Sequence, residues 1–160
     1  METVVLANHI KRTVRGPMWH GPSLDEVLKG ITPELAAARP IPGAHSIWEL
    51  VLHVTAWAEI SEARLRGERM ADPAPEEDWP PVGATDQAAW DQALARLRES
   101  HRTLAHAVRH LDASLMHEKM PGLEYSRSNL LHGVIEHGTY HGGQIALLKR
   151  SAASQRSARL

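Results

Sequence analysis

The chain contains no cysteine in its 160 residues. It can therefore form no disulfide, offer no thiolate to a metal and use no cysteine nucleophile, so any thiol chemistry requires an external thiol. Long apolar runs are also missing, since none approaches the ~20 residues needed to cross a bilayer. Charged side chains are scattered through residues 1–15, where a signal peptide would have an apolar core. We therefore expect a cytoplasmic protein.

A strong charge of either sign is absent as well. The formal net charge is -1 at pH 7, which provides no electrostatic footprint for nucleic acid or for an anionic membrane. We expect neither as a partner, and a small-molecule substrate instead. A chain of this length suits one domain that buries ~70% of the surface exposed in the unfolded chain. No internal repeat is evident.

Four long segments carry apolar residues at helical intervals. The predicted helices run from about Glu2 to Val14, Ser46 to Arg66, Thr85 to Leu111 and Asn129 to Arg150. Capping boxes of the form S-x-x-E begin at Ser23 and Ser46, and Pro33 after Thr32 opens a further short helix. The expected fold is all-α, with the third long helix carrying the packing seam of a bundle.

Two segments have no helical period. Residues Gly67 to Gly83 contain several prolines and an acidic run, which predicts a long connection that could act as a flap over a site. Trp79 within it is interpreted as an anchor for the connection more readily than as a cover for a pocket. Ser151 to Leu160 is polar and aperiodic, so we expect a domain over residues 1–150 followed by a disordered tail.

His137 and His141 have the spacing of a metal-ligand pair. Residues four apart on a helix differ by ~40° in direction and ~6 Å in rise, so both rings can reach one point. Both also lie on the apolar face of the last long helix, where polar rings need partners. With 11 histidines, chance alone gives roughly one such pair, and His106 and His110 form another that lies off its apolar seam. Two hydrogen-bonded core histidines remain the alternative for the first pair.

A pair supplies only two ligands, and a mononuclear catalytic site usually has three protein ligands plus an open position. His53 is the best candidate for the third, because it lies at the edge of the apolar stripe of the second long helix, between Leu50 and Trp57. A single histidine in such a place is more often a hydrogen-bonded core residue. The pair on the last helix favours ligation here.

His101 is the only polar member of the apolar seam of the third long helix. It could be a fourth ligand, a proton carrier or a structural hydrogen-bonding group. We predict a buried neighbour of the site that is not a ligand, and assign it as the candidate catalytic residue. His132 lies about 140° around the helix from His137 and so faces away. The remaining histidines lie at predicted loops or helix ends, where nothing brings them together: His9, His20, His45 and His117.

Several short motifs stand in a characteristic order: Trp19-His20-Gly21-Pro22-Ser23, Pro42-Gly43-Ala44-His45-Ser46-Ile47-Trp48, Leu50-Val51-Leu52-His53 followed by Trp57, and His137-Gly138-Thr139-Tyr140-His141-Gly142-Gly143-Gln144-Ile145. Together they resemble the DinB-like (YfiT-like) superfamily of small metal-binding bundles over nearly the whole chain. The resemblance implies a four-helix bundle with a long crossover, a homodimer, and metal ligands at His53, His137 and His141. Glu136 departs from the residue that many relatives have beside the ligand.

Characterised relatives include transferases that use bacillithiol or mycothiol and a thiol-dependent maleylpyruvate isomerase, while most members have no assigned reaction. Three neutral imidazoles leave a divalent metal with its full charge and an open position. The site could then hold the thiolate of a small thiol that attacks an electrophile. It could instead hold hydroxide in a hydrolase, or serve a non-enzymatic metal-binding bundle. Zinc or nickel is the expected metal, with copper and iron also suited to imidazole.

Overall fold

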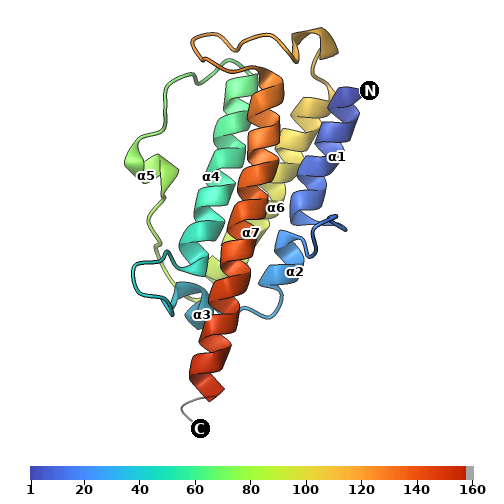
Figure 1. Ribbon diagram of the computed structural model, residues 1–160. Helices are drawn as coiled ribbons and strands as arrows, with labels where there is room; N and C mark the ends of the chain where they lie inside the picture. The colour runs from blue at the N-terminus through green and yellow to red at the C-terminus, as the bar shows by residue number, and fades with distance from the viewer. Residues whose placement is uncertain (158–160) are drawn as a thin grey trace.

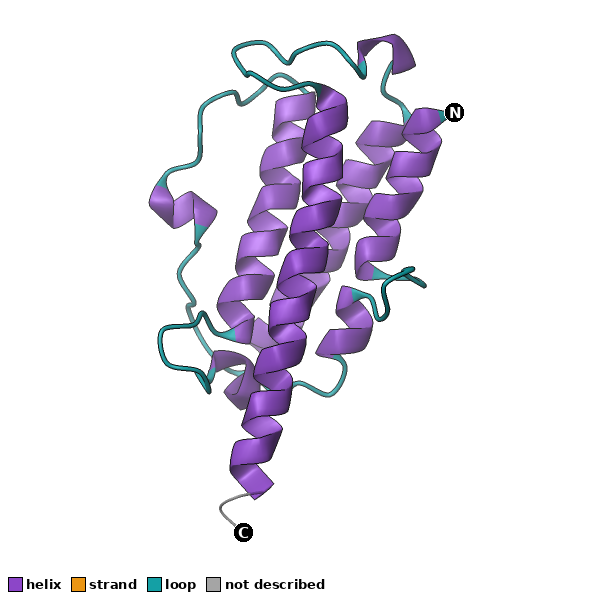
Figure 2. Cartoon of the chain, in the orientation of Figure 1, coloured by secondary structure: helices purple, strands orange, loops and turns teal. Residues whose placement is uncertain are grey.

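Four long helices form the body of the molecule in the computed structural model, which describes residues 1–157 (Figures 1 and 2). They are α1 (Glu2–Val14), α4 (Ile47–Leu65), α6 (Gln87–Arg109) and α7 (Arg127–Ser157). Short helices occupy the connections: α2 (Leu24–Leu28), α3 (Pro33–Ala37), α5 (Pro75–Asp78) and the 3₁₀ turn η1 (Ala113–Leu115). No strand occurs in the described residues, so the predicted all-α class is confirmed.

The four long helices pack as a bundle in which α1 and α4 each contact both α6 and α7. Figure 1 shows that α4 and α6 run in the same direction, while α1 and α7 run in the opposite one. Because α4 and α6 are parallel, the chain must return along the length of the bundle between them. The connection that does so carries α5 down the outer side of α4 (Figure 1). The predicted four-helix bundle with a long crossover is confirmed.

The beginning and the end of α4 are set by local sequence. At its start the Ser46 backbone N–H donates to the Glu49 carboxylate at 2.7 Å, and the Glu49 N–H donates to Ser46 Oγ at 3.2 Å, which satisfies two of the helix's free donors. At its end Gly67 has a φ of +76°, and the N–H of Glu68 reaches back to the carbonyl of Ala63. That is a Schellman motif, which favours glycine at this position.

The core consists of two apolar clusters with a histidine layer between them. On α6 one cluster ends at Leu97 and the other begins at Leu104. On α7 one ends at Val134 and the other begins at Ile145. Three histidines lie in these gaps: His101 on α6, and His137 and His141 on α7. A layer of polar side chains therefore lies in the middle of the bundle, between the two apolar clusters.

The predicted disordered tail is wrong for residues 151–157. These residues continue α7 to Ser157, Ala152 is buried, and the Gln155 side-chain amide donates to the Pro40 carbonyl at 2.9 Å. Contacts with the chain before α4 hold this part of the helix, and a local pattern cannot show them. Residues 158–160 of the predicted tail lie outside the described residues. The short helices α5 and η1 were not predicted either.

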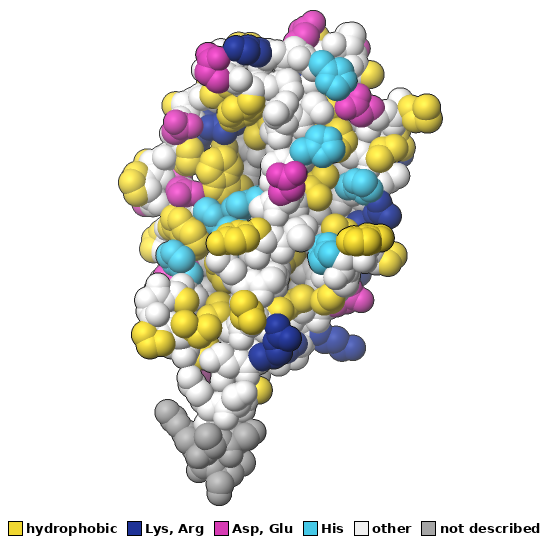
Figure 3. All heavy atoms as spheres, in the orientation of Figure 1, with side chains coloured by type: hydrophobic (Ala, Val, Ile, Leu, Met, Phe, Trp, Pro, Cys, Tyr) yellow, Lys and Arg dark blue, Asp and Glu magenta, His cyan; other side chains and the backbone are white. Residues whose placement is uncertain are grey.

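Acidic and basic side chains are scattered over the face seen in Figure 3, with no large area of one sign. Histidine and hydrophobic side chains occupy much of the same face. Among the described residues, no helix combines the length and the apolar character that a membrane span needs.

Two glycines of α7 should respond in opposite ways to replacement by alanine. A Cβ on Gly138 would lie 2.6 Å from Cγ2 of Thr13 on α1, a buried, β-branched side chain with little freedom to move. We expect Gly138→Ala to lower the free energy of unfolding by about 1–3 kcal/mol. A Cβ on Gly143 would meet nothing within 4 Å, so Gly143→Ala should raise it by about 1 kcal/mol through helix propensity.

Urea unfolding of both variants measures these changes. The combined variant Thr13→Ala/Gly138→Ala is the control, because removing Cγ2 of Thr13 should restore most of the lost stability. An equal effect of alanine at the two glycines would show that α1 and α7 do not approach closely at Gly138.

Candidate metal centre

The helices α4 and α7 bring three histidines together. His53 projects from α4, and His137 and His141 project from successive turns of α7. One ring nitrogen from each lies within 4.8 Å of the others. His53 and His141 are each 5% exposed, and His137 is partly buried. The three residues predicted as ligands therefore form one cluster, as the helical spacing implied.

The Nε2 atoms of the rings converge. His137 Nε2 is central, 2.9 Å from Nε2 of His53 and 3.0 Å from Nε2 of His141. The rings meet edge to face, with interplanar angles of 64° and 83° for the same two pairs. This arrangement directs three nitrogen atoms at a common region between α4 and α7.

The other ring nitrogens of two members are held by oxygen acceptors. His53 Nδ1 lies 2.6 Å from the backbone carbonyl of Asp78, and because a carbonyl can only accept, Nδ1 must carry the proton. His141 Nδ1 lies 2.6 Å from Oε1 of Gln144, which likewise favours a proton on Nδ1. Metal-binding histidines are oriented in this way by a second hydrogen bond.

These hydrogen bonds leave the cluster short of protons. With Nδ1 protonated, the neutral rings of His53 and His141 present lone pairs at Nε2, and His137 Nε2–H could donate to only one of them. No set of neutral rings therefore satisfies both short contacts. A cation between the three lone pairs would satisfy all of them, so the donor set fits a divalent metal.

The rings are also kept neutral. Burial, together with the nearby His141, His53 and His101, lowers the pKa of His137 to about 3. Burial likewise lowers the pKa of His53 and of His141, although hydrogen bonds from each to its oxygen acceptor oppose the effect. Neutral imidazole is the form that binds metal. The cluster is therefore ready to coordinate a cation at neutral pH without losing protons first.

The crossover connection covers one side of the cluster. The Trp79 ring stacks on His53 with centroids 3.8 Å apart and on His45 at 3.6 Å. Asp78 adds a carboxylate that accepts from the Trp57 indole N–H at 2.7 Å. The connection over residues 67–83 thus packs onto the site, and Trp79 both anchors it and covers His53. Through Trp79, His45 lies beside the site, a place that the sequence pattern did not indicate.

His101 does not join the three. It is 1% exposed, its Nδ1 lies 3.0 Å from the Leu97 carbonyl, and its Nε2 is buried with no hydrogen-bond partner. Burial lowers its pKa to about 4. It is a buried neighbour at the level of the cluster, and its catalytic role stays a prediction. His106, His110 and His132 are exposed, as expected from their positions off the apolar faces.

Sequence reasoning missed several residues around the site. Gln144 had a usable signal, since it follows His141 by three residues on the same face of the helix. Asp78 had none, because its carbonyl reaches His53 only through the path of the crossover connection. Arg64 was also missed, although it follows His53 by eleven residues, close to three turns of helix, and so faces the same way. A buried arginine contradicts the usual hydrophobic pattern.

Comparison with known proteins identifies the family of the chain. The family model described as the DinB superfamily matches residues 19–145, more than half of the chain. The matched range includes all three clustered histidines and the crossover connection. No curated protein and no solved structure matches the chain. The match supports the resemblance drawn from the short motifs.

Removal of any one clustered histidine should abolish or greatly weaken metal binding, because two imidazoles cannot hold the ion as three do. The variants are His53→Ala, His137→Ala and His141→Ala, and the measurement is bound metal per chain by mass spectrometry of purified protein. His106→Ala is the matched control, since it breaks an exposed histidine pair of the same spacing. Unchanged metal content in His53→Ala would eliminate the three-ligand site.

Replacement of His101 by leucine should leave metal content unchanged and reduce the loss of stability in acid. Its folded-state pKa of about 4 lies below that of an unfolded histidine, so the unfolded chain binds the proton first as pH falls. The free energy of unfolding therefore falls as the pH drops from about 6.5 to about 4, because only the unfolded chain binds a proton at residue 101 in that range. At pH 5 the loss is about 2 kcal/mol.

Urea unfolding at pH 7 and pH 5 measures the difference between wild type and His101→Leu. The clustered histidines are present in both proteins, so the difference reports residue 101 together with its effect on the pKa of the nearby His137. Loss of metal in a folded His101→Leu variant would instead place His101 among the ligands.

Proposed function

The chain belongs to the DinB superfamily, and from this we propose that it is a divalent-metal-dependent enzyme with ligands at His53, His137 and His141. One observation carries the proposal: Nε2 of His137 lies within hydrogen-bonding distance of Nε2 of both His53 and His141, and the neutral rings have too few protons to satisfy both contacts. Structural metal sites usually have four protein ligands, whereas three leave a position for a reacting group. A three-histidine set therefore favours catalysis over a purely structural role.

A divalent ion bound there would act as a Lewis acid that favours the ionised form of a small nucleophile at its open position. The neutral donor set suits zinc or nickel, and iron also accepts imidazole. The chain's own residues supply orientation. The Asp78 carbonyl and the Gln144 side chain fix the rings of His53 and His141, and Trp79 covers the His53 face against water.

We propose a low-molecular-weight thiol as the nucleophile. The chain has no cysteine of its own, so sulfur chemistry at this site needs a second, small substrate. The thiol would release its proton to solvent water, its sulfur would form a bond to carbon of an electrophile, and the group displaced there would leave with the bonding electron pair. The rival hypothesis is a hydrolase, in which water takes the place of the thiol.

The two hypotheses predict different assays. Wild-type protein mixed with bacillithiol or another cellular thiol and a model electrophile should form adduct faster than the uncatalysed background. His141→Ala should reduce the rate by more than the ten- to hundred-fold that loss of an outer-sphere partner costs. Chelation of the metal should do the same, and His106→Ala should leave the rate unchanged.

Metal-dependent cleavage of a model ester or amide, with no acceleration by any thiol, would replace the transferase hypothesis with the hydrolase one. No activity in either assay from metal-loaded protein would favour a non-enzymatic metal-binding bundle.

A further inference from the structure

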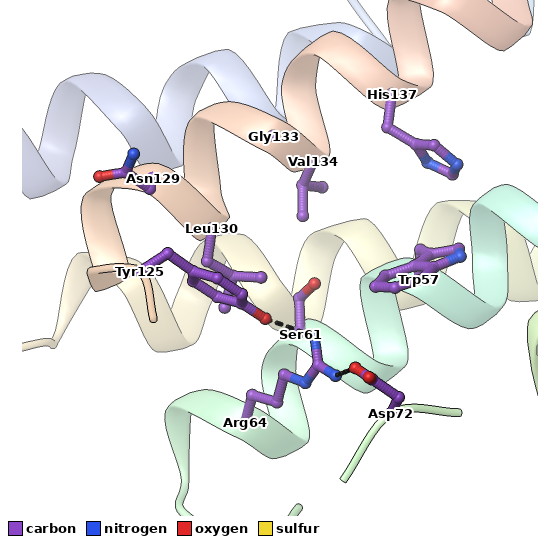
Figure 4. A pocket seen from close by; sticks show the side chains of 10 residues that line it. All are labelled: Trp57, Ser61, Arg64, Asp72, Tyr125, Asn129, Leu130, Gly133, Val134 and His137. Carbon is purple, nitrogen blue, oxygen red and sulfur yellow. Dashed lines mark hydrogen bonds and ion pairs between the residues drawn. The ribbon is translucent and has the colours of Figure 1, made fainter. Parts of the chain in front are cut away.

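A pocket of about 470 Å³ continues from the histidine cluster along the groove between α4 and α7. Its α4 wall is a stripe at helical spacing, Trp57, Ser61 and Arg64, which extends the line that begins at His53. Figure 4 shows His137 and Trp57 at one end, and Tyr125 and Arg64 at the other. The two ends therefore differ in chemistry, with a metal ligand at one and a cationic group at the other.

The cation at the far end is buried. The Arg64 side chain is 2% exposed, and its Nη1 donates to the Tyr125 hydroxyl at 2.6 Å. Its Nη2 donates to the Ala71 carbonyl at 3.2 Å and lies 3.3 Å from a carboxylate oxygen of Asp72. The Asp72 side chain is 96% exposed, so water screens its charge and the pair contributes little. A buried guanidinium is thus left with a weak counter-ion.

Hydrogen-bond donors outnumber acceptors around this cation. The Tyr125 oxygen accepts from Arg64, so its own O–H is left to donate, and no acceptor for it is found among the described residues. Ser61 is fully buried, and its hydroxyl has no partner. Arg64 Nε also has none. Figure 4 shows the Ser61 hydroxyl directed toward Val134, across the pocket. This end of the pocket therefore presents unpaired hydrogen-bond donors that suit an anionic group of a ligand.

Apolar groups line the space between the two ends. Trp57, Leu130 and Val134 contribute side chains, and Gly133 contributes none, which leaves room beside α7. The Trp57 ring also lies 5.7 Å from the Arg64 guanidinium carbon, within the range of a cation–π contact. A ligand that fills this space therefore needs an apolar body.

We propose that the pocket binds the carboxylate of a small organic acid, with Arg64, Tyr125 and Ser61 as its donors and the apolar body directed toward the metal. A single guanidinium beside an acidic residue matches a monoanion, whereas a phosphate dianion would meet Asp72 with no second cation to offset it. The proposal rests on the proposed function, because it names the class of one of that enzyme's substrates. Either the electrophile or the thiol can be this acid, and in both cases the pocket would bind the same carboxylate group.

Asp72 then competes with the substrate. Its carboxylate contacts the same guanidinium that the ligand needs, from a connection outside the helices. Its removal should strengthen binding of a carboxylate and leave binding of the neutral analogue unchanged. Loss of Arg64 should weaken binding of a carboxylate and also leave binding of the neutral analogue unchanged. The two changes have opposite signs, and a general disturbance of the fold would weaken binding in both.

Hexanoate and hexanamide are suitable probes, because they share one apolar chain and differ in charge. Calorimetric titration of the metal-loaded protein should show hexanoate binding at least ten-fold more tightly than hexanamide. Arg64→Gln should remove about ten- to a hundred-fold of the hexanoate affinity, the value of a charged hydrogen bond. Asp72→Asn should raise hexanoate affinity several-fold. Equal binding of the two probes by wild type would overturn the proposal.

Tyr125→Phe and Ser61→Ala provide variants that keep the buried charge, in case Arg64→Gln does not fold. Each should weaken hexanoate binding and leave hexanamide binding unchanged. Arg64→Gln, if folded, should keep its full metal content. Unchanged hexanoate affinity in both hydroxyl variants and in Asp72→Asn would likewise overturn the proposal.

The same titration on metal-free protein separates this proposal from the proposed function. Hexanoate binding that persists without metal supports the carboxylate site even if no thiol reaction is found. In the enzymatic assay, hexanoate should inhibit competitively against whichever substrate carries the carboxylate. Competition with the electrophile identifies that substrate as the acid, and competition with the thiol identifies the thiol. Competition with neither would show that the pocket is not a substrate site.

Discussion

A shortage of protons among three converging imidazoles is the constraint on which the site depends. The Asp78 carbonyl directs the His53 proton to Nδ1, and Gln144 does the same for His141, so lone pairs face His137 from two sides. Such a group is unfavourable inside an apolar bundle unless something positive lies between the rings. The antiparallel helices α4 and α7 bring the three rings together, and Trp79 stacks on one of them.

Much of the fold could be predicted because its signals are local. The capping box at Ser46 and the apolar period placed α1, α4 and α6 close to their observed bounds, and the box at Ser23 marked the start of the short α2. The cluster itself could be predicted because two of its members share one helix face, and His53 lies on the apolar edge of another long helix. Helical geometry and the resemblance together carried that inference across 84 residues of sequence.

The remainder depends on contacts that no local pattern contains. The end of α7 lacks an apolar period, yet Gln155 is held by the Pro40 carbonyl, so the segment is helical where a tail was expected. Asp78 and Trp79 reach His53 because of where the crossover passes, which depends on the whole bundle. Arg64 is polar at a buried position, and its role is visible only once Tyr125 and Ser61 surround it.

The direction in which α4 and α6 run has a further consequence for how such a protein can diversify. Two parallel helices that follow each other in the chain cannot be joined by a tight turn. A long connection along the outside of the bundle is therefore unavoidable, whatever its sequence. In this molecule that obligatory segment supplies Trp79 over the metal site and Asp72 beside the pocket. Two residues beside the histidines and the pocket therefore lie on a connection outside the four long helices, although Trp79 also packs against the apolar core. Changes in that connection can alter what surrounds the histidines and the pocket, while the helices that carry the three histidines stay as they are.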